Sequence, residues 1–466
     1  MALKWLFLLA CVTWDGAQGL SLDQHDAPAV IKSQIHRRER ITNKIQKRTS
    51  DTSVSFDNPS PGFNPLYYLN LTVGTPPQEI QVELDTSSGY LDITGDNSTA
   101  CDYMKCASGF FDVKASSSYQ FSNANFNLTT TWEKSFNGDF GNDNVTINDM
   151  TISNMDLAVN TGLDWGNYLG LGYVVSETSD APGTILQAMV DNQYIKSAAY
   201  SLWVEEAGTE GTILFGGVNK AKYTGNLYTM PIPAHSGIHY LPLVLVTGVT
   251  LQTSNISDSQ TSGLPAYMVL DTMVAETFLP TDIVEHIYND LNVTWEGNQQ
   301  YGLIDCSMKQ KDYNMTFTFS GFNLTIPLGD FISPGENTLC AFNIVPSLGE
   351  TSVLGNTFLC KVYAVFDLSN NEISLAARDF DGGEDRILEI ASGSTPISGA
   401  VTKSSTATAT VPTAVISPSA VRQFPISSTT GSLTITSTSK GAASVPTGIP
   451  NNIVAGLIGA GLLIAL

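Results

Sequence analysis

An internal repeat is the feature of this 466-residue chain that most limits its possible folds. Two Asp-Thr dipeptides, which begin at Asp85 and Asp271, each follow a short and mainly apolar run. An apolar-apolar-Gly triplet follows each of them, so that Gly170 lies 85 residues after Asp85 and Gly355 lies 84 residues after Asp271. The nearly equal spacing predicts two copies of one structural unit, each of which contributes one carboxylate.

Two such units facing each other would bring Asp85 and Asp271 into one cleft. Neighbouring carboxylates cannot both ionise cheaply, so they share a proton and take opposite roles. The ionised group can draw a proton from a water molecule while the protonated group polarises a peptide carbonyl. The repeat therefore predicts amide hydrolysis without a covalent intermediate, a metal or a cofactor.

Other hydrolytic chemistries fit the chain poorly. The histidines beyond residue 48 are His235, His239 and His286, and the sequence has neither a Gly-x-Ser-x-Gly nor a His-Glu-x-x-His motif. His235 and His239 have a spacing that can hold a metal on a helix, but Pro233 and Gly237 predict a surface loop there.

The N-terminus has the features of an exported precursor. Residues 1–19 combine Lys4, an apolar stretch and a small-residue exit, which predicts a secretory signal peptide. Residues 20–48 are basic and end in Lys47-Arg48, a pair suited to dibasic cleavage, so we predict a propeptide. A solvated basic arm is the alternative.

The charge is distributed unevenly along the chain. Residues 1–48 hold eight of the 22 Lys and Arg and four of the 44 Asp and Glu, which leaves a net charge of −26 on the rest, from 14 basic and 40 acidic residues. So acidic a surface makes nucleic acid an improbable partner, because phosphate binding needs clustered Lys and Arg. It favours an acid environment, and a basic propeptide could inhibit an acidic cleft electrostatically until acid protonates the carboxylates.

The C-terminal part has a stalk-like composition followed by an apolar tail. Residues 392–440 are dominated by Ser, Thr, Ala and Pro, which predicts an O-glycosylated stalk. Residues 441–466 begin with small residues at Gly441 and continue with a polar spacer. They end in an apolar tail that is short for a membrane-spanning helix. This pattern predicts a GPI-attachment signal with Gly441 as the attachment residue, and a tail-anchored helix is the alternative. We therefore expect the protein at the cell surface, on the plasma membrane or the cell wall.

The cysteines fit an exported chain, in which disulfides form readily. The predicted pairs are Cys101 with Cys106 and Cys306 with Cys340, and Cys360 is predicted to be a buried free thiol. Eight Asn-x-Ser/Thr sites are compatible with a secreted glycoprotein: Asn70, Asn97, Asn127, Asn144, Asn255, Asn292, Asn314 and Asn323.

The middle of the chain has the pattern of β-structure. Between about residues 60 and 380, short alternating apolar runs are separated by Gly, Pro, Asn and Asp. Helical patterns are few and brief, and the best of them are Thr184 to Asn192 and Thr281 to Leu291.

Several ordered motifs closely resemble those of pepsin-like aspartic proteases, and among these the GPI-anchored fungal yapsin-type enzymes. The motifs are Tyr67 to Gln78, Val82 to Thr86, Leu169 to Gly172, Gly211 to Gly217, Val269 to Thr272 and Val353 to Phe358. The resemblance covers roughly residues 64–380. It implies an all-β, bilobal fold with a few short helices and a cleft between two pseudo-twofold-related lobes, at about 64–235 and 236–380.

The resemblance also assigns roles to individual residues. Asp85 and Asp271 would be the catalytic dyad, and Thr86 and Thr272 would hydrogen-bond across the lobe interface to hold it. Ser88 lies where the family keeps a hydroxyl that bonds the first Asp.

Three residues depart from the family pattern next to the dyad. Ser87 and Met273 replace the glycine that follows each Asp-Thr pair. Because glycine permits backbone geometry and close approach that other residues resist, Met273 could strain or crowd Asp271. Val274 replaces a hydroxyl residue of the second lobe, and the loss of that donor should raise the pKa of Asp271.

The expected flap also differs from the family pattern. The resemblance implies a β-hairpin from about Thr129 to Ile147 that closes over an extended peptide. Trp132 aligns with the family's flap tyrosine, and Asp92 stands in place of the tryptophan that bonds it. An indole N–H is a donor, so a Trp132–Asp92 hydrogen bond would restore the link with reversed polarity. Two unrelated surface residues are the alternative.

Two functions follow from this pattern. The first is a monomeric aspartic endopeptidase tethered to the cell surface, which cleaves extended peptides or proteins at acid pH. The second is a catalytically impaired relative that binds peptides or cell-wall components. The two Asp-Thr pairs favour catalysis, whereas Ser87, Met273, Val274 and the altered flap favour impairment.

Overall fold

The computed structural model describes part of the chain, and every structural statement below concerns that part: residues 22–23, 28–38, 66–98, 108–129, 135–161, 167–174, 183–204, 210–235, 237–255, 257–295, 301–335, 338–347, 351–391, 400–403 and 407–412. None of the helices in these ranges is long and apolar enough to span a membrane. Outside them lie the predicted signal peptide, the Lys47-Arg48 cleavage site, the Cys101–Cys106 pair, Trp132 and the attachment signal with Gly441.

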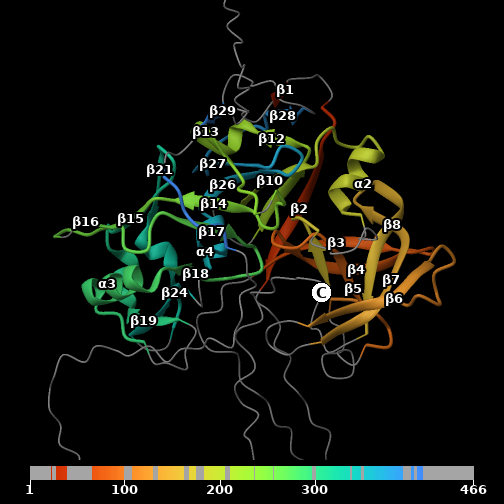
Figure 1. Ribbon diagram of the computed structural model, residues 1–466, viewed down its shortest axis with the longest axis horizontal. Coiled ribbons are helices and arrows are strands. Elements are labelled where there is room, and N and C mark those ends of the chain that lie inside the picture. Colours follow the sequence, from red (N-terminus) through yellow and green to blue (C-terminus); the bar gives the residue numbers. More distant parts are fainter. Residues whose placement is uncertain are drawn as a thin grey trace, which may run out of the picture.

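A 14-stranded sheet runs from the centre of the molecule into the first lobe. Its order is β29 (Ala400–Thr402), β13 (Tyr223–Pro231), β27 (Glu372–Arg378), β26 (Val362–Asp367), β10 (Ala199–Val204), β11 (Glu210–Phe215), β2 (Ile31–Arg38), β3 (Leu66–Val73), β4 (Gln78–Asp85), β9 (Tyr168–Gly170), β5 (Leu91–Thr94), β8 (Met150–Asn160), β7 (Ser135–Ile147) and β6 (Gln120–Thr129). In Figure 1 strands β6 to β8 lie on the right and β13 and β27 lie left of centre.

The second lobe, on the left of Figure 1, contains smaller sheets. A five-stranded sheet has the order β14 (Leu243–Val246), β17 (Ala266–Leu270), β25 (Ser352–Leu354), β18 (Thr277–Leu279) and β24 (Ile344–Pro346). A four-stranded sheet has the order β16 (Ser257–Gln260), β15 (Gly248–Gln252), β20 (Asn314–Thr318) and β21 (Asn323–Pro327). A three-stranded sheet of this lobe has the order β19 (Gly302–Asp305), β23 (Leu339–Phe342), β22 (Ile332–Ser333). Another three-stranded sheet, with the order β1 (Leu22–Asp23), β28 (Ile387–Ile390), β12 (Gly217–Asn219), lies at the top of Figure 1 and packs with central strands of the large sheet.

The helices are short and two of them lie where the sequence predicts them. They are α2 (Ile185–Asp191), α3 (Thr281–Leu291) and α4 (Asn356–Leu359), with 3₁₀ turns at Lys220–Lys222, Cys306–Gln310 and Leu328–Phe331. The Thr184 hydroxyl caps α2 by accepting a hydrogen bond from the Gln187 N–H at 3.1 Å. Helix α3 spans the predicted residues and ends at Asn292, which has a left-handed conformation. The predicted fold class, mainly β with a few short helices, is confirmed.

The sequence repeat is a structural repeat. In the first lobe β4 is parallel to β9, and β5 is antiparallel to β9 and parallel to β8. In the second lobe β17, β25, β18 and β24 pair in the same way. Leu84 therefore lies beside Leu169, as Leu270 lies beside Leu354. The structure confirms two pseudo-twofold-related lobes, in each of which the apolar-Gly segment flanks the Asp-Thr pair.

A continuous apolar core supports both of the strands that lead to the Asp-Thr pairs. One cluster of buried side chains includes Leu84 of β4, Leu270 of β17 and Phe358 of α4. In the central sheet the Tyr200 ring stacks on Phe366, with ring centres 4.8 Å apart. Because protein interiors are close-packed, this core limits movement of the two strand ends relative to each other.

Part of the predicted propeptide is a strand of the large sheet. Strand β2 pairs with both β11 and β3. Ile35 is fully buried in the main core, while Lys32, Gln34 and His36 are exposed. Residues 31–36 therefore have the alternating burial of an integral strand and do not form a solvated arm. Cleavage after Arg48 stays a prediction.

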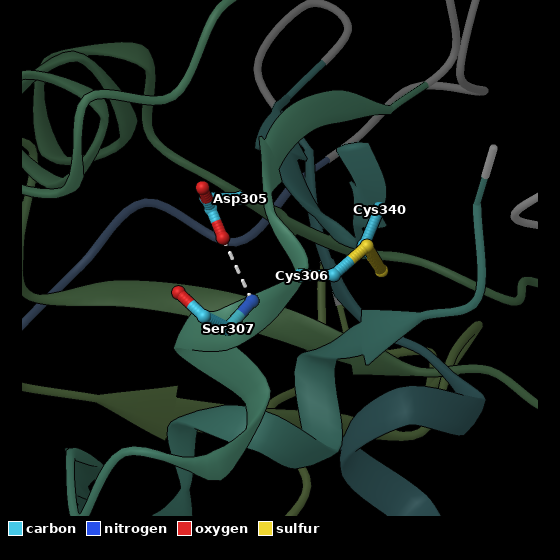
Figure 2. The surroundings of a disulfide bond; sticks show 4 residues. All are labelled: Asp305, Cys306, Ser307 and Cys340. Atoms are coloured by element: carbon cyan, nitrogen blue, oxygen red, sulfur yellow. Dashed lines mark hydrogen bonds between the residues drawn. A yellow bond between two sulfur atoms is a disulfide. The ribbon is translucent and has the colours of Figure 1, made fainter. Parts of the chain in front are cut away.

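The predicted disulfide between Cys306 and Cys340 is present, and it joins the 3₁₀ turn after β19 to β23 (Figure 2). The Asp305 carboxylate caps this turn by accepting a hydrogen bond from the Ser307 N–H at 2.8 Å. Cys360 is a buried thiol, as predicted, and its Sγ donates to Thr357 O at 3.7 Å. The covalent link thus closes a loop of the second lobe.

Removal of this disulfide should destabilise the protein. The cysteines are 34 residues apart, and a cross-link over such a loop contributes about 3 to 4 kcal/mol to the free energy of unfolding. The double variant Cys306→Ala/Cys340→Ala should show this loss in urea denaturation. Cys360→Ala is the matched control and should lose less, about 1 kcal/mol. Equal losses in the two variants would contradict the stabilising role.

Two buried acids oppose each other where β26 turns into β27. Asp367 and Glu372 are cross-strand partners, and both are nearly inaccessible to solvent. Burial, and next the charge of Asp367, raise the pKa of Glu372 to about 8. Burial also raises the pKa of Asp367, against hydrogen bonds from Asn370 and Ser197 that lower it.

This acid pair predicts a loss of stability as the pH rises. The pKa of Glu372 is about 8 in the folded protein against an ordinary value of 4.5. The contribution of protonated Glu372 to the free energy of unfolding is therefore complete below pH 4.5 and is lost progressively up to pH 8. Glu372→Gln should flatten the fall of the melting temperature between pH 5 and 8, measured by scanning calorimetry. The exposed Glu285 gives the control Glu285→Gln, which should follow the parent. A parent-like slope in Glu372→Gln would refute this assignment.

Candidate active site

Asp85 and Asp271 lie at corresponding ends of equivalent strands. Asp85 is the last residue of β4, and Asp271 directly follows β17. Their side chains are almost completely buried, at 2% and 1% exposure. Buried carboxylates are costly unless they are neutral or hydrogen-bonded, so their partners decide which of them ionises.

The two threonines form the predicted hydrogen bonds across the lobe interface. The Thr86 N–H donates to Thr272 Oγ1 at 3.1 Å, and the Thr272 N–H donates to Thr86 Oγ1 at 3.1 Å. Each hydroxyl in turn donates to the opposite lobe: Thr86 Oγ1 to Leu270 O at 2.8 Å, and Thr272 Oγ1 to Leu84 O at 2.6 Å. These four buried bonds tie both catalytic loops together, and each is expensive to leave unmade.

The apolar-Gly segments close the back of each catalytic loop. The Leu171 N–H donates to Asp85 O at 2.7 Å, and the Asn356 side chain donates to Thr272 O at 2.7 Å. A Cβ atom on Gly172 would collide with Thr86 O, and one on Gly355 would collide with Glu276 O. Glycine is therefore needed at both positions because the backbones approach closely.

The two carboxylates titrate as an unequal pair. Burial raises the pKa of Asp85, and hydrogen bonds from Ser87 and Ser88 lower it. Burial also raises the pKa of Asp271, and the neighbouring charge of Asp85 raises it further. The charge of Asp85 therefore keeps the proton on Asp271. Asp85 is the group that ionises first.

Ser87 lowers the pKa of both carboxylates: its hydroxyl and its N–H act on Asp85, and its hydroxyl also acts on Asp271. Asp85 Oδ1 accepts hydrogen bonds from Ser87 Oγ at 2.7 Å, from the Ser87 N–H at 2.8 Å and from the Ser88 N–H at 3.2 Å. Asp271 Oδ1 accepts one from the Met273 N–H at 2.8 Å. Sequence reasoning treated Ser87 as a departure from glycine and missed that its hydroxyl contacts a catalytic oxygen. The signal was a hydroxyl side chain two residues after the Asp.

The suspected strain at Met273 is not found. Neither Ser87 nor Met273 has a positive φ angle, so both adopt backbone conformations open to ordinary residues. The Met273 side chain is buried at 3% exposure. Val274 packs in an apolar cluster and offers no hydroxyl. The pKa of Asp271 is raised as predicted, but burial and Asp85 are the main causes.

The predicted flap is part of a longer hairpin. Strands β6 and β7 pair from Gln120 to Thr129 against Ser135 to Asn142, and β7 continues beside β8. The ring of Phe140 in β7 contacts Tyr90 beside the first catalytic loop, with ring centres 6.2 Å apart. Asp92 is buried in β5, but Trp132 lies outside the described residues. A Trp132–Asp92 bond therefore stays a prediction.

His235 and His239 lie away from any acidic or cysteine cluster. The His235 N–H donates to Ile238 O at 2.9 Å and the Ile238 N–H donates back at 3.0 Å, which makes a tight turn. His239 stacks on Tyr173, with ring centres 5.9 Å apart. Among the residues with described positions, no group of three His, Cys, Asp or Glu side chains has the arrangement of a metal site.

Tyr200 is a second residue that sequence reasoning missed. It is fully buried in β10, and burial raises the pKa of its hydroxyl, as does the charge of Asp85. The phenol therefore stays protonated. Its sequence context, an alternating apolar strand, gives no hint of this position, which depends on the packing of the central sheet.

Comparisons with known proteins agree on one family. Residues 66–378 match the family model described as eukaryotic aspartyl protease. The chain is 35% identical, over 100% of both proteins, to the probable aspartic-type endopeptidase opsB of Aspergillus oryzae. It is also 35% identical to the protein of that name from Aspergillus fumigatus, over 83% of this chain and 84% of the relative. Aspartic proteinase yapsin-3 of Saccharomyces cerevisiae is 30% identical over 69% of this chain and 68% of the relative.

The Ser87 hydroxyl should hold the pKa of Asp85 down. Ser87→Ala removes one donor to the ionised carboxylate, so the Asp85 pKa should rise by about one unit. Carboxyl-labelled aspartate and ¹³C NMR titration measure this, with Asp85→Asn to assign the signal. The exposed Ser257 of β16 provides the control Ser257→Ala, which should leave the titration unchanged. An unshifted or lower Asp85 pKa in Ser87→Ala would show that the hydroxyl does not stabilise the anion.

Proposed function

Because the chain belongs to the eukaryotic aspartyl protease family, we propose that it is a cell-surface endopeptidase that hydrolyses peptide bonds with water activated between Asp85 and Asp271. The observation that supports catalysis most strongly is the electrostatic coupling of these two buried carboxylates across the lobe interface. Two such groups that hold one proton supply a base and an acid at the same site.

The unequal hydrogen bonding assigns the roles. Ionised Asp85 takes a proton from water, the water oxygen bonds to the carbonyl carbon, and protonated Asp271 gives its proton to the carbonyl oxygen. In the second step Asp85 passes its proton to the leaving nitrogen as the C–N bond breaks, and Asp271 recovers a proton from the diol. The pair then has its starting protonation, so no cofactor is consumed.

The required state has one proton on the pair, and this sets the pH range. That state exists between the pKa of Asp85 and the pKa of Asp271, both of which are raised above the ordinary value of 3.8. Activity should therefore extend to weakly acid pH and not be confined to strongly acid pH. The acidic chain and the stability of the Asp367–Glu372 pair at low pH agree with an acid environment.

The proposed location rests on the sequence of the two ends. The signal peptide at 1–19, the stalk at 392–440 and the attachment signal at 441–466 together support export and a GPI anchor in the membrane. Extended peptides or proteins are the proposed substrates, the protein is proposed to act as a monomer, and the acidic surface disfavours nucleic acid.

A second function is favoured by one specific observation. Ser87 Oγ already occupies a hydrogen-bonding position on Asp85 Oδ1, and Val274 provides no hydroxyl near Asp271. A dyad altered in this way could bind peptides or wall components without cleaving them. Measurement of turnover separates the two functions directly.

Loss of either carboxylate should abolish hydrolysis. Asp85→Asn and Asp271→Asn each remove one of the two roles, so kcat/KM should fall by about 10³-fold or more. Digestion of an internally quenched peptide library between pH 3 and 7 measures this. The exposed Asp96 of the same lobe gives the control Asp96→Asn, which should retain activity.

Two outcomes would count against the proposal. Near-parental turnover in either dyad variant would exclude the assigned mechanism. A parent protein that binds peptides but cleaves none of the library would favour the binding function instead.

A further inference from the structure

The chain folds back onto the molecule after the second lobe. Strand β29 pairs in parallel with β13 at the edge of the large sheet, and the Lys403 N–H donates to Thr229 O at 2.8 Å. Lys403 Nζ also lies 5.5 Å from the centre of the Tyr228 ring. Residues 400–403 of the predicted stalk are therefore held against the body of the protein.

Residues 407–412, Ala-Thr-Ala-Thr-Val-Pro, then lie along a surface. Ala407, Ala409 and Val411 are half-buried, whereas Thr408 and Thr410 are exposed. A period of two in burial indicates an extended chain with one face against the protein. Val411 packs on a group of side chains that we call the cleft-face cluster: Leu241, Leu243, Val269, Val274 and Val353, with Tyr240, Tyr267 and Phe278 at its border.

The cleft-face cluster lies on the side of the five-stranded sheet that carries Asp271. Side chains alternate across a strand, so Tyr267, Val269 and Asp271 share one face, while Met268 and Leu270 point into the main core. The register places the β14 and β25 members of the cluster beside Val269. Val411 therefore rests on the face from which the second catalytic carboxylate projects.

From this geometry we propose that residues 407–412 are an intramolecular ligand of the cleft, which occupies an apolar subsite beside Asp271 and competes with peptides. This proposal rests on the proposed function, since it assigns the same cleft to extended peptides. Peptides that bind along a protein surface commonly do so in extended form, with alternate side chains turned toward the protein, and this segment has alternate side chains half-buried.

The chemistry of the contact defines what the subsite accepts. The segment carries no charge, and its buried contact is a β-branched aliphatic side chain on an aliphatic and aromatic surface. Val274 belongs to this surface. The residue that replaces a hydroxyl beside Asp271 is therefore part of the apolar surface on which Val411 packs. The subsite should favour Val or Ile in an external peptide over polar residues.

The short link to Lys403 favours binding of residues 407–412 to the subsite of their own molecule. Three residues separate the Lys403 anchor from Ala407, and so short a link gives an effective concentration of the order of millimolar or above. An external peptide then binds only the fraction of molecules whose subsite is open, and its apparent affinity is reduced by that fraction. Weakening the Val411 contact should therefore tighten external binding.

The first test measures binding without turnover. In the full chain made inactive by Asp85→Asn/Asp271→Asn, Val411→Asn should lower the Kd for the hexapeptide Ala-Thr-Ala-Thr-Val-Pro by about tenfold in isothermal titration calorimetry. Thr410→Asn is the matched control, because Thr410 is exposed, and should leave the Kd unchanged. An unchanged or higher Kd in Val411→Asn would overturn the proposal.

The second test uses the active chain and separates this proposal from the proposed function. Val411→Asn should lower KM for a peptide substrate by a similar factor and leave kcat unchanged. A chain that never turns over but shows the tighter hexapeptide binding would remove the endopeptidase and keep the intramolecular ligand. Turnover with identical KM values in the parent, Val411→Asn and Thr410→Asn would keep the endopeptidase and remove the intramolecular ligand.

A third measurement needs no substitution. In the unaltered chain, saturating hexapeptide should displace the segment and speed amide hydrogen exchange at residues 407–411, measured by mass spectrometry. Exchange that is unchanged when the peptide binds would show that the two do not compete.

Discussion

The reciprocal hydrogen bonds between Thr86 and Thr272 are the interaction on which the rest of the site depends. Each threonine uses both its N–H and its hydroxyl to reach the other lobe. The carboxylates are on the preceding residues, so their separation is fixed by this link. Because all four bonds are buried, the loops cannot move apart without exposing or orphaning polar groups. The lobes can therefore be built largely from separate sheets and still present one catalytic pair.

The proposed chemistry depends on a difference in hydrogen bonding between the Asp85 and Asp271 carboxylates. Both carboxylates are buried, but Asp85 Oδ1 accepts three hydrogen bonds and Asp271 Oδ1 accepts one from Met273. Asp85, whose Oδ1 accepts more hydrogen bonds, ionises first, and its charge keeps the proton on Asp271. Ser87, at a position where the family pattern has glycine, lowers the pKa of both groups, and the N–H groups of Ser87 and Ser88 act on Asp85 alone.

The sequence predicts the parts of this structure that follow from periodicity and repeats. The two Asp-Thr units, helices α2 and α3 and the Cys306–Cys340 disulfide are where the sequence predicts them. The helices follow from capping and periodicity in consecutive residues, the Asp-Thr units from the equal spacing of similar motifs, and the disulfide from the small number of cysteines in an exported chain.

Other features depend on contacts between distant segments, which one sequence does not reveal. The sequence did not reveal that the Ser87 hydroxyl donates a hydrogen bond to Asp85. The prediction of strain at Met273 was wrong because the backbone there adopts an ordinary conformation. The contact of Val411 was missed because a Ser/Thr-rich composition predicts a stalk whatever single apolar residue it contains. Composition averages over residues, whereas packing depends on one side chain at one place.

The most direct test of the central claim is a ¹³C titration of the Asp271 carboxyl in the parent and in Asp85→Asn. If the threonine link holds the two groups as one acid pair, removal of the Asp85 charge should lower the pKa of Asp271 by at least one unit. An Asp271 pKa that is the same in both proteins would show that the carboxylates titrate independently, and would contradict the account.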